Sequence, residues 1–252
     1  MTEYNVLTLF PGMFSSVMGS SIWARAVKAG LIAVNPVDIR DYTTDKHRRA
    51  DDYPFGGGSG MVMSAQPVDA CFADIKERCP KPCVNVYMSP RGKRLTHGLV
   101  RRLSGFLCVN ILCGHYEGVD ERVIEKHIDL EISVGDFVLT GGEIAAMALI
   151  DACIRHVEGV LGNSDSARAE SFSDALLEQP QYTRPAVFDA KPVPEVLLSG
   201  DHAKIAAYNR RMSIIETARR RPELLSETVF SGDEIEFITG TKPDNRKPRG
   251  KK

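Results

Sequence analysis

The stretch that decides the fold is EISVGDFVLTGGE, at residues 131–143. It begins with partly alternating residues, turns at Gly135-Asp136, runs apolar over residues 137–139 and ends in two glycines. Residues 144–154 follow directly and are apolar on almost every side, which is typical of a buried helix. The stretch therefore predicts a glycine loop between a buried strand and a buried helix, where a ligand can approach the main chain. A tight structural turn explains this stretch alone equally well.

The same arrangement occurs twice upstream. Residues 84–88 and 106–113 are apolar, and each run precedes a glycine-containing segment, SPRG at 89–92 and GHYEG at 114–118. Strands that alternate with short helices indicate an α/β domain with a largely parallel sheet. Ligands bind such sheets at the carboxyl ends of the strands, so the three loops predict one pocket.

The rest of the N-terminal part completes this α/β domain. Weak alternation predicts a strand over residues 4–10, and helical periodicity predicts a helix over 13–29 that ends at Gly30. Further expected elements are short strands over 32–34 and 37–40 around Pro36, a helix over 66–78, a short helix from Thr96 to residue 103 with Thr96 as its N-cap, and a helical turn over 119–126.

The C-terminal part has a different pattern. Residues 162–175 are mostly small, polar or charged without periodicity, and we interpret them as a linker or lid. Residues 176–200 are rich in proline and are expected to be extended. The chain is therefore expected to divide into an α/β domain at 1–161, the linker at 162–175, and a small, mainly helical domain with a basic tail at 176–252.

The last clear helix is expected over residues 201–221, where Pro222 stops it. Residues 242–252 carry six Lys or Arg and are expected to be disordered. The apolar stripe of the helix is predicted to consist of Ile205, Tyr208, Met212 and Ile215.

The composition is that of an ordinary soluble globular protein. The 252 residues are 43% hydrophobic and 26% charged, and no run of about 18 apolar residues would span a membrane. The N-terminus lacks the features of a secretory signal. The six cysteines form no Cys-x-x-Cys pair and the six histidines show no zinc-ligand spacing, so we expect no metal site. The scattered cysteines indicate a reduced, cytoplasmic setting, and we expect no contact with a membrane.

Basic residues occur in two places that suit a polyanionic partner. From residue 201 onward, twelve Lys or Arg oppose eight Asp or Glu, although the net charge of the chain is -1. The long, glycine-rich segment at 41–61 combines Lys46, Arg48 and Arg49 with two aromatic residues, which suits phosphate contacts and base stacking. A solvated surface helix and a disordered loop are the alternatives for these two features.

Three common nucleotide or nucleophile motifs are absent. The Gly-Lys pairs lack the spacing of a phosphate-binding loop, and no Gly-x-Gly-x-x-Gly opens a helix after a strand. Ser59 lies in the long loop and outside any Gly-x-Ser-x-Gly nucleophile motif.

The chain resembles the bacterial tRNA (guanine-N1)-methyltransferase family (TrmD) of the SPOUT superfamily. The similarity runs from residue 7 to residue 225 and rests on several motifs in one order. These motifs are YPFGGGSGM at 53–61, SPRG at 89–92, GHYEGVDER at 114–122, SVGDFVLTGGE at 133–143 and PQYTRP at 180–185.

The resemblance implies methyl transfer from S-adenosylmethionine to N1 of the guanosine on the 3′ side of the anticodon, position 37 of tRNA. It also implies a deep trefoil knot, a homodimer with the active site at the subunit interface, and a possible Mg²⁺ requirement. The residues implied for the cofactor are Tyr87, Pro90, Gly114, Glu117, Val134, Gly135, Asp136, Phe137, Val138, Leu139, Gly141 and Gly142.

For catalysis the resemblance implies a linker carboxylate as general base and an arginine that stabilises charge on guanine O6. These map to Glu170 and Arg155. Many relatives carry aspartate at the position of Glu170, and Asp165 and Asp174 are nearby alternatives for the base. Without the resemblance, Glu170 would read as a solvated carboxylate and Arg155 as a helix C-cap.

The residues expected to contact tRNA are Lys46, Arg48, Arg49, Ser59, Arg184, Arg210, Arg211 and Arg219. A methyltransferase of another RNA and a non-catalytic RNA-binding protein on the same fold are the competing functions. The intact pocket glycines and Arg155 disfavour the non-catalytic reading, and the motif at 180–185 favours tRNA.

Overall fold

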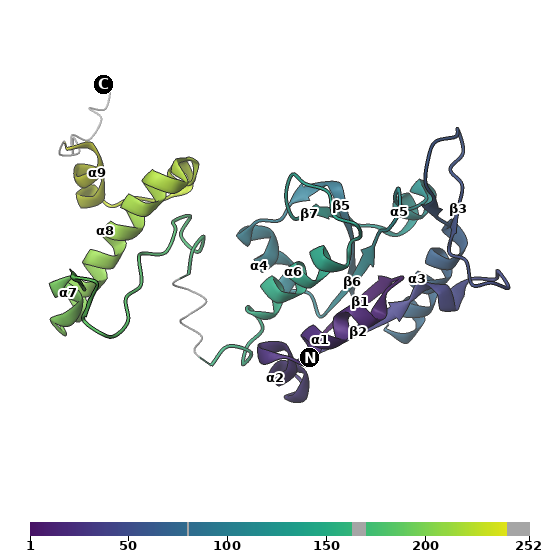
Figure 1. The fold of residues 1–252 in the computed structure, drawn as a ribbon, viewed down its shortest axis with the longest axis horizontal. Helices are drawn as coiled ribbons and strands as arrows, with labels where there is room; N and C mark the ends of the chain where they lie inside the picture. The colour runs from purple at the N-terminus through teal and green to yellow at the C-terminus, as the bar shows by residue number, and fades with distance from the viewer. Residues whose placement is uncertain (80, 163–169, 241–252) are drawn as a thin grey trace, which may run out of the picture. The chain divides into compact units, whose positions relative to one another are not determined.

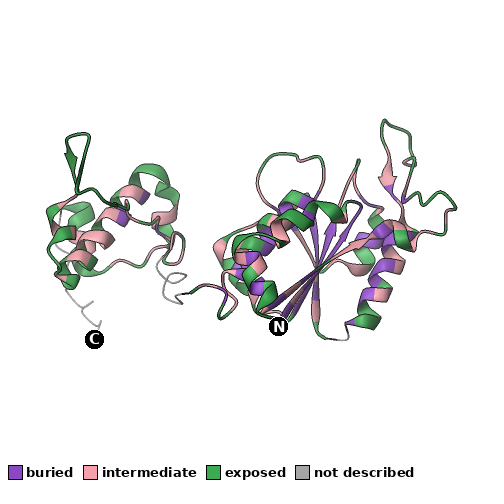
Figure 2. Cartoon of the chain, turned by 60° about the horizontal axis from the view of Figure 1, so that its bottom comes forward, coloured by how far each residue is buried: buried purple, intermediate pink, exposed green. Residues whose placement is uncertain are grey.

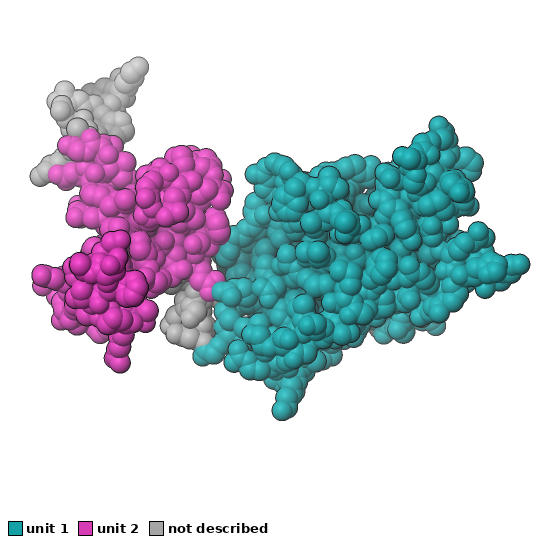
Figure 3. All heavy atoms as spheres, viewed as in Figure 1, with its two compact units in different colours: residues 1–164 teal, residues 165–252 magenta. Residues whose placement is uncertain are grey.

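The computed structural model describes residues 1–79, 81–162 and 170–240 (Figure 1). The chain forms two compact units, unit 1 at Met1–Ser164 and unit 2 at Asp165–Lys252, which Figure 3 draws in different colours. No helix in the described ranges is long and apolar enough to cross a membrane.

Unit 1 is built on a five-stranded sheet in which every pairing is parallel. The strand order is β2-β1-β6-β5-β7, so β1, β6 and β5 are inner strands and β2 and β7 are the edge strands. The strands are β1 (Thr2–Thr8), β2 (Ile32–Asp38), β5 (Cys83–Arg94), β6 (Cys108–Cys113) and β7 (Leu130–Ser133). The predicted α/β class with a parallel sheet is confirmed.

Helices cover both faces of this sheet, and the buried residues gather in the strands between them (Figure 2). One face packs against α2 (Ser21–Lys28), α4 (His97–Ser104) and α6 (Glu143–Ile154). The other face packs against α3 (Ala65–Arg78) and α5 (Glu121–His127). Successive strand residues point to opposite faces, so Val6 joins the first core and Leu7 the second. A sheet buried on both sides explains why its strands read as continuous apolar runs.

The prediction of one continuous helix over residues 13–29 is wrong. The chain forms a short 3₁₀ turn, η1 (Pro11–Phe14), then α1 (Ser15–Met18), and only then α2. Gly19 ends α1, and Ser20 takes an extended conformation before the second helix begins. Glycine is a poor helix residue because it loses more backbone freedom on folding than other residues, which explains the break.

The two strand pieces expected around Pro36 form one strand, β2. This strand lies at the edge of the sheet, with β1 as its one neighbour. Proline lacks the N–H that an inner strand needs, and an edge strand tolerates it.

Strand β5 continues beyond the predicted end at residue 88. Its pairing with β7 shifts so that Met88 and Lys93 both lie opposite Ile132, and the intervening SPRG segment bulges out of the ladder. A side chain on Gly92 would lie 2.4 Å from the main chain of Glu131, so a glycine is required where the bulge returns to the sheet.

The apolar run at 137–139 lies in the predicted glycine loop between β7 and α6. Phe137 is 57% exposed and Val138 is 82% exposed. The helix that follows, α6, is confirmed, but it is not buried all round, because Ile144 is 53% exposed.

Three further helices of unit 1, α3, α4 and α5, are confirmed. α3 and α5 lie where the periodicity predicts them. The Thr96 hydroxyl accepts a hydrogen bond from the Leu99 N–H at 3.3 Å and caps α4. This contact is the predicted N-cap.

Unit 2 contains α7 (Glu195–Leu198), α8 (His202–Arg220) and α9 (Gly232–Thr239), with a small hairpin of β8 (Val187–Phe188) and β9 (Lys191–Pro192). The predicted helix is confirmed as α8, and Pro222 begins the 3₁₀ segment η4 (Pro222–Glu227) that follows it. The buried face of α8 consists of Ser213, Ile214 and Thr217, whereas Ile215 of the predicted stripe is 39% exposed. The basic tail at 242–252 lies outside the described residues.

Candidate cofactor pocket and RNA-binding loop

A cavity of about 470 Å³ lies at the carboxyl ends of β5, β6 and β7 in unit 1. Three segments supply most of its walls, at residues 87–91, 114–121 and 132–142. They are the three loops that the sequence predicts to form one pocket. The volume lies in the range of about 300–1,000 Å³ that is usual for sites of small ligands.

Eleven of the twelve residues expected at the cofactor line this cavity. Asp136 does not line it, because its exposed carboxylate pairs with Arg94 at 2.6 Å. The lining residues are Tyr87, Pro90, Gly114, Glu117, Val134, Gly135, Phe137, Val138, Leu139, Gly141 and Gly142.

Two of the glycines let main chains meet at the cavity. The Gly142 N–H donates a hydrogen bond to the Gly114 carbonyl at 2.8 Å and joins two of the loops. A Cβ on Gly142 would lie 2.8 Å from the Cys113 Cα, and a Cβ on Gly114 would lie 2.7 Å from the Tyr87 hydroxyl. Side chains at these two positions would collide with the walls, so the glycines keep this part of the pocket open to a ligand.

The buried side chain of Glu143 lies next to the pocket and contacts residues of two neighbouring segments. Glu143 begins α6, is 2% exposed, and accepts a hydrogen bond from the Thr8 hydroxyl at 2.8 Å. Its other oxygen lies 3.9 Å from Nδ1 of His115, a pocket residue. A negative charge at a helix N-terminus is favourable, and this one ties the end of β1 to α6.

Several polar lining residues were missed by the sequence reading, although each lies inside or next to a predicted loop. Arg91 pairs with Glu121 at 3.0 Å, and this contact raises the pKa of the Arg91 guanidinium. The charge of Arg91 directly before Gly92 was the signal that could have identified this residue. The missed polar residues are Ser89, Arg91, His115, Tyr116, Glu121, Ser133 and Thr140.

The two catalytic candidates belong to different compact units. Arg155 is the C-cap residue of α6 in unit 1, and it has interaction partners. Glu170 lies at the described start of unit 2, where its carbonyl accepts from the Ser173 N–H at 3.2 Å. Of the alternatives, Asp174 lies 3.5 Å from Arg210 and is largely exposed, and Asp165 lies outside the described residues.

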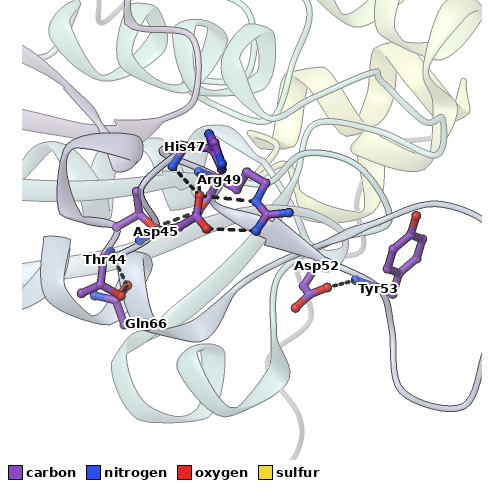
Figure 4. Close-up of polar contacts among 8 residues, drawn as sticks. Thr44, Asp45, His47, Arg49, Asp52, Tyr53 and Gln66 are labelled. Atoms are coloured by element: carbon purple, nitrogen blue, oxygen red, sulfur yellow. Dashed lines mark hydrogen bonds and ion pairs between the residues drawn. The ribbon is translucent and has the colours of Figure 1, made fainter.

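The expected RNA-binding loop extends from a two-stranded ribbon of β3 (Asp51–Asp52) and β4 (Val62–Met63). Figure 4 shows its base, where the Asp45 carboxylate accepts from the His47 N–H at 2.8 Å and from the Arg49 guanidinium at 3.0 Å. These contacts, with Arg49 the strongest, hold the pKa of Asp45 well below its usual range. The base of the loop is therefore held by hydrogen bonds of its own.

The tip of this loop carries exposed aromatic rings. Tyr53 is 78% exposed and Phe55 is fully exposed, and Ser59 lies exposed beyond them. Lys46 is also exposed, whereas Arg48 pairs with Asp41. Exposed aromatic and basic side chains together suit a nucleic acid.

The arginines expected to bind RNA in unit 2 have partners within that unit. Arg210 pairs with Glu234 at 2.6 Å, and Arg219 pairs with Glu216 at 2.9 Å. The guanidinium of Arg211 lies 4.3 Å from the centre of the Phe237 ring. Arg184 is exposed, and no ion pair to it is found among the described residues.

Comparisons with known proteins identify the family of the chain. The sequence profile of the family described as "tRNA (Guanine-1)-methyltransferase TrmD" matches residues 2–227. Proteins named tRNA (guanine-N(1)-)-methyltransferase are similar to the chain: one from Geobacter metallireducens is 48% identical over 94% of this chain and 96% of its own length, and one from Ruminiclostridium cellulolyticum is 52% identical over 89% and 97%. A relative of the same name from Caldanaerobacter subterraneus is 51% identical over 93% and 96%. The chain therefore belongs to the tRNA (Guanine-1)-methyltransferase TrmD family.

Proposed function

We propose that this protein transfers a methyl group from S-adenosylmethionine to N1 of guanosine 37 in tRNA, in the cytoplasm. The observation that carries the proposal is the cavity built from three glycine loops at the strand ends, in a chain that belongs to this family. The proposed knot passes through these same loops, and the proposed tRNA-binding domain is unit 2 with its basic tail.

The residues of the cavity fit S-adenosylmethionine. The absence of side chains at Gly114 and Gly142 would keep this part of the cavity open to the ligand. Val134 and Leu139 would offer apolar contacts, and Glu117 would offer a carboxylate to a positively charged group of the ligand. The ligand brings a methyl group on a positively charged sulfur, which is the electrophile of the reaction.

The target nitrogen must lose its proton as the methyl group arrives. Guanine N1 carries a hydrogen at neutral pH, and a carboxylate within hydrogen-bond reach accelerates its removal by about 10²–10⁴-fold. We assign this role to Glu170. Negative charge then grows on guanine O6, and the Arg155 guanidinium stabilises it by donating hydrogen bonds.

We assign no protein-borne Mg²⁺ site. Magnesium prefers oxygen ligands, such as carboxylates and water. The one close cluster of potential metal ligands in the described ranges is made of three thiols. The metal expectation therefore rests on the resemblance alone.

The tRNA would contact both the segment at 41–61 and unit 2. Most of the arginines expected there lie in surface ion pairs, such as Arg49 with Asp45. Exposed pairs of this kind contribute about 0–1 kcal/mol, so a phosphate group can replace the carboxylate at little cost. The guanine must leave the base stack to enter the pocket, which costs about a few kcal/mol and is offset by such contacts.

The function is tested by methyl incorporation from labelled S-adenosylmethionine into two tRNA transcripts that differ at position 37. We expect label in the transcript with G and none in the transcript with A. Label in neither, with cofactor binding intact, would overturn the tRNA proposal and favour another RNA substrate. Label in both would place the methyl group outside position 37.

We propose further that the enzyme is a homodimer whose interface includes the exposed face of α6. Ile144 and Ala148 lie one helical turn apart on that face, and exposed Val138 precedes it. A second copy of the chain would cover this apolar surface beside the cavity and complete the active site.

Replacing Ile144 with Glu is therefore expected to give a monomer. An unpaired carboxylate in an apolar interface weakens association by about 2 kcal/mol or more, or roughly 30-fold in the dissociation constant. Light scattering coupled to gel filtration measures the mass. Leu107→Glu, at a residue just before β6 that is 57% exposed, is the matched control and should remain dimeric. A dimeric Ile144→Glu protein would contradict this interface.

A further inference from the structure

Three cysteines and a glutamate meet at the amino-terminal edge of the sheet, at the opposite ends of the strands from the cofactor pocket. Glu3 on β1 lies in register with Cys108 on β6, and Cys108 lies in register with Cys83 on β5. Residues in register on parallel strands project from the same face of the sheet. Cys79, the C-cap residue of α3, comes from the helix that packs on this face.

The donor atoms of these side chains are already close. The three Sγ atoms lie within 4.8 Å of one another, and those of Cys79 and Cys108 are 3.5 Å apart. One carboxylate oxygen of Glu3, Oε2, lies 3.3 Å from Sγ of Cys79. Cys108 is fully buried and Cys79 is 8% exposed, so the cluster is shielded on its inner side.

This spacing is that of a zinc-type site. Zinc binds thiolate sulfur at about 2.3 Å in a tetrahedron, which places neighbouring sulfurs about 3.8 Å apart. We propose that Cys79, Cys83, Cys108 and Glu3 bind one divalent cation of the zinc class as a structural site. On binding, each thiol releases its proton to solvent and its sulfur forms a bond to the cation, while Glu3 binds as the carboxylate.

Polar neighbours of the cluster would orient bound ligands, while burial raises the pKa of the Cys83 and Cys108 thiols. The Asn5 side-chain amide donates towards Sγ of Cys108 at 3.5 Å and towards the Asn110 carbonyl oxygen at 2.9 Å. Hydrogen bonds from such outer partners orient metal ligands and stabilise their charge. Lys81 holds the other oxygen of Glu3, Oε1, at 2.6 Å, which leaves Oε2 towards the sulfurs and reduces the negative charge of the site.

A metal site accounts for more of this geometry than a disulfide does. A disulfide would use two of the three sulfurs and would require an oxidant. A cation uses all four side chains and joins the end of α3 to three strands. The sequence reading missed the site because Cys79 and Cys83 have a spacing of four and Cys108 comes much later, so only the strand register brings the three together.

The test uses Co²⁺ as a coloured probe for zinc, added to the reduced, metal-free full-length protein. We expect one Co²⁺ per chain, with the charge-transfer and visible bands of tetrahedral thiolate coordination, and displacement of the bands by Zn²⁺. Binding should release three protons per ion in weakly buffered solution, one for each thiol. Neither readout depends on the proposed methyltransferase activity.

Cys83→Ser and Glu3→Gln should each weaken binding by more than about tenfold. Cys71→Ser is the matched control, since Cys71 is a buried cysteine of α3 outside the cluster, and it should bind as the parent does. Absence of thiolate bands, or bands unchanged in Glu3→Gln and Cys83→Ser, would overturn the proposal. Loss of two thiols on mild oxidation without any metal binding would also overturn it and assign the cluster to disulfide chemistry.

Discussion

Replacing Glu170 with Gln is expected to lower the rate of methyl transfer to tRNA by about 10²–10⁴-fold. The amide keeps the size of the side chain but cannot accept the N1 proton at neutral pH. Cofactor affinity should stay within about twofold, because none of the lining residues of the cavity is changed. The measurement is a single-turnover rate at saturating cofactor and tRNA, which reports the chemical step without product release.

The matched controls decide between neighbouring carboxylates. Asp174→Asn removes a largely exposed carboxylate that lies 3.5 Å from Arg210, and it should leave the rate unchanged. Asp165→Asn should do the same, and Glu170→Asp should retain a large part of the activity. A full rate in Glu170→Gln, with a loss in one of the aspartate variants, would move the base to that residue.

The segment that follows Glu170 is held in place by hydrogen bonds. Phe172 adopts a positive φ of 75°, and its N–H closes a turn on the Leu176 carbonyl at 2.7 Å. Leu176 is buried, and the next N–H, that of Leu177, donates to the Thr217 hydroxyl of α8 at 2.8 Å. The segment after Glu170 is thus attached to the helix proposed to bind tRNA, and base and substrate would be positioned by the same unit.

The loops of the pocket could be predicted from the sequence because each of three apolar strands is followed by glycine, which favours turns. A helix or strand is destabilised by glycine, so its repeated presence at three strand ends marks turns where main chain must come close. The N-cap at Thr96 and the end of α8 before Pro222 could also be predicted, because each depends on the preference of one residue for a local backbone position.

Features that depend on distant partners could not be predicted. The loop that holds residues 137–139 was predicted, but their apolar character did not indicate that Phe137 and Val138 are exposed in the single chain. The periodicity of α8 predicts Ile215 on its buried face, but Ser213 and Thr217 are buried instead. The Thr217 hydroxyl accepts a hydrogen bond from the Leu177 N–H, a distant contact that helical periodicity does not indicate. The thiol cluster depends on strand register, and register is set by the whole sheet.

Replacing Gly142 with Ala is expected to raise the dissociation constant for S-adenosylmethionine by at least about tenfold. The φ of Gly142 is -77°, which any residue adopts, so the effect would come from space alone. The new methyl carbon would lie 2.8 Å from the Cys113 Cα and 3.0 Å from the Gly114 nitrogen, and both are main-chain atoms that cannot rotate away. The loop carrying Gly142 must therefore shift, and the hydrogen bond to Gly114 that shapes the pocket must lengthen.

Calorimetric titration measures the affinity, and thermal unfolding measures the accompanying loss of stability. Overpacking of this kind costs about 1–3 kcal/mol, or a fall in Tm of about 2–4 °C for each kcal/mol in a chain of this size. Gly98→Ala is the matched control, since a Cβ at Gly98 meets nothing within 4 Å and α4 gains a better helix residue. Equal affinity in Gly142→Ala and the parent would show that the glycine loops serve the sheet and not the cofactor. A loss of affinity confined to Gly142→Ala would tie the closest contact between the two loops to cofactor binding.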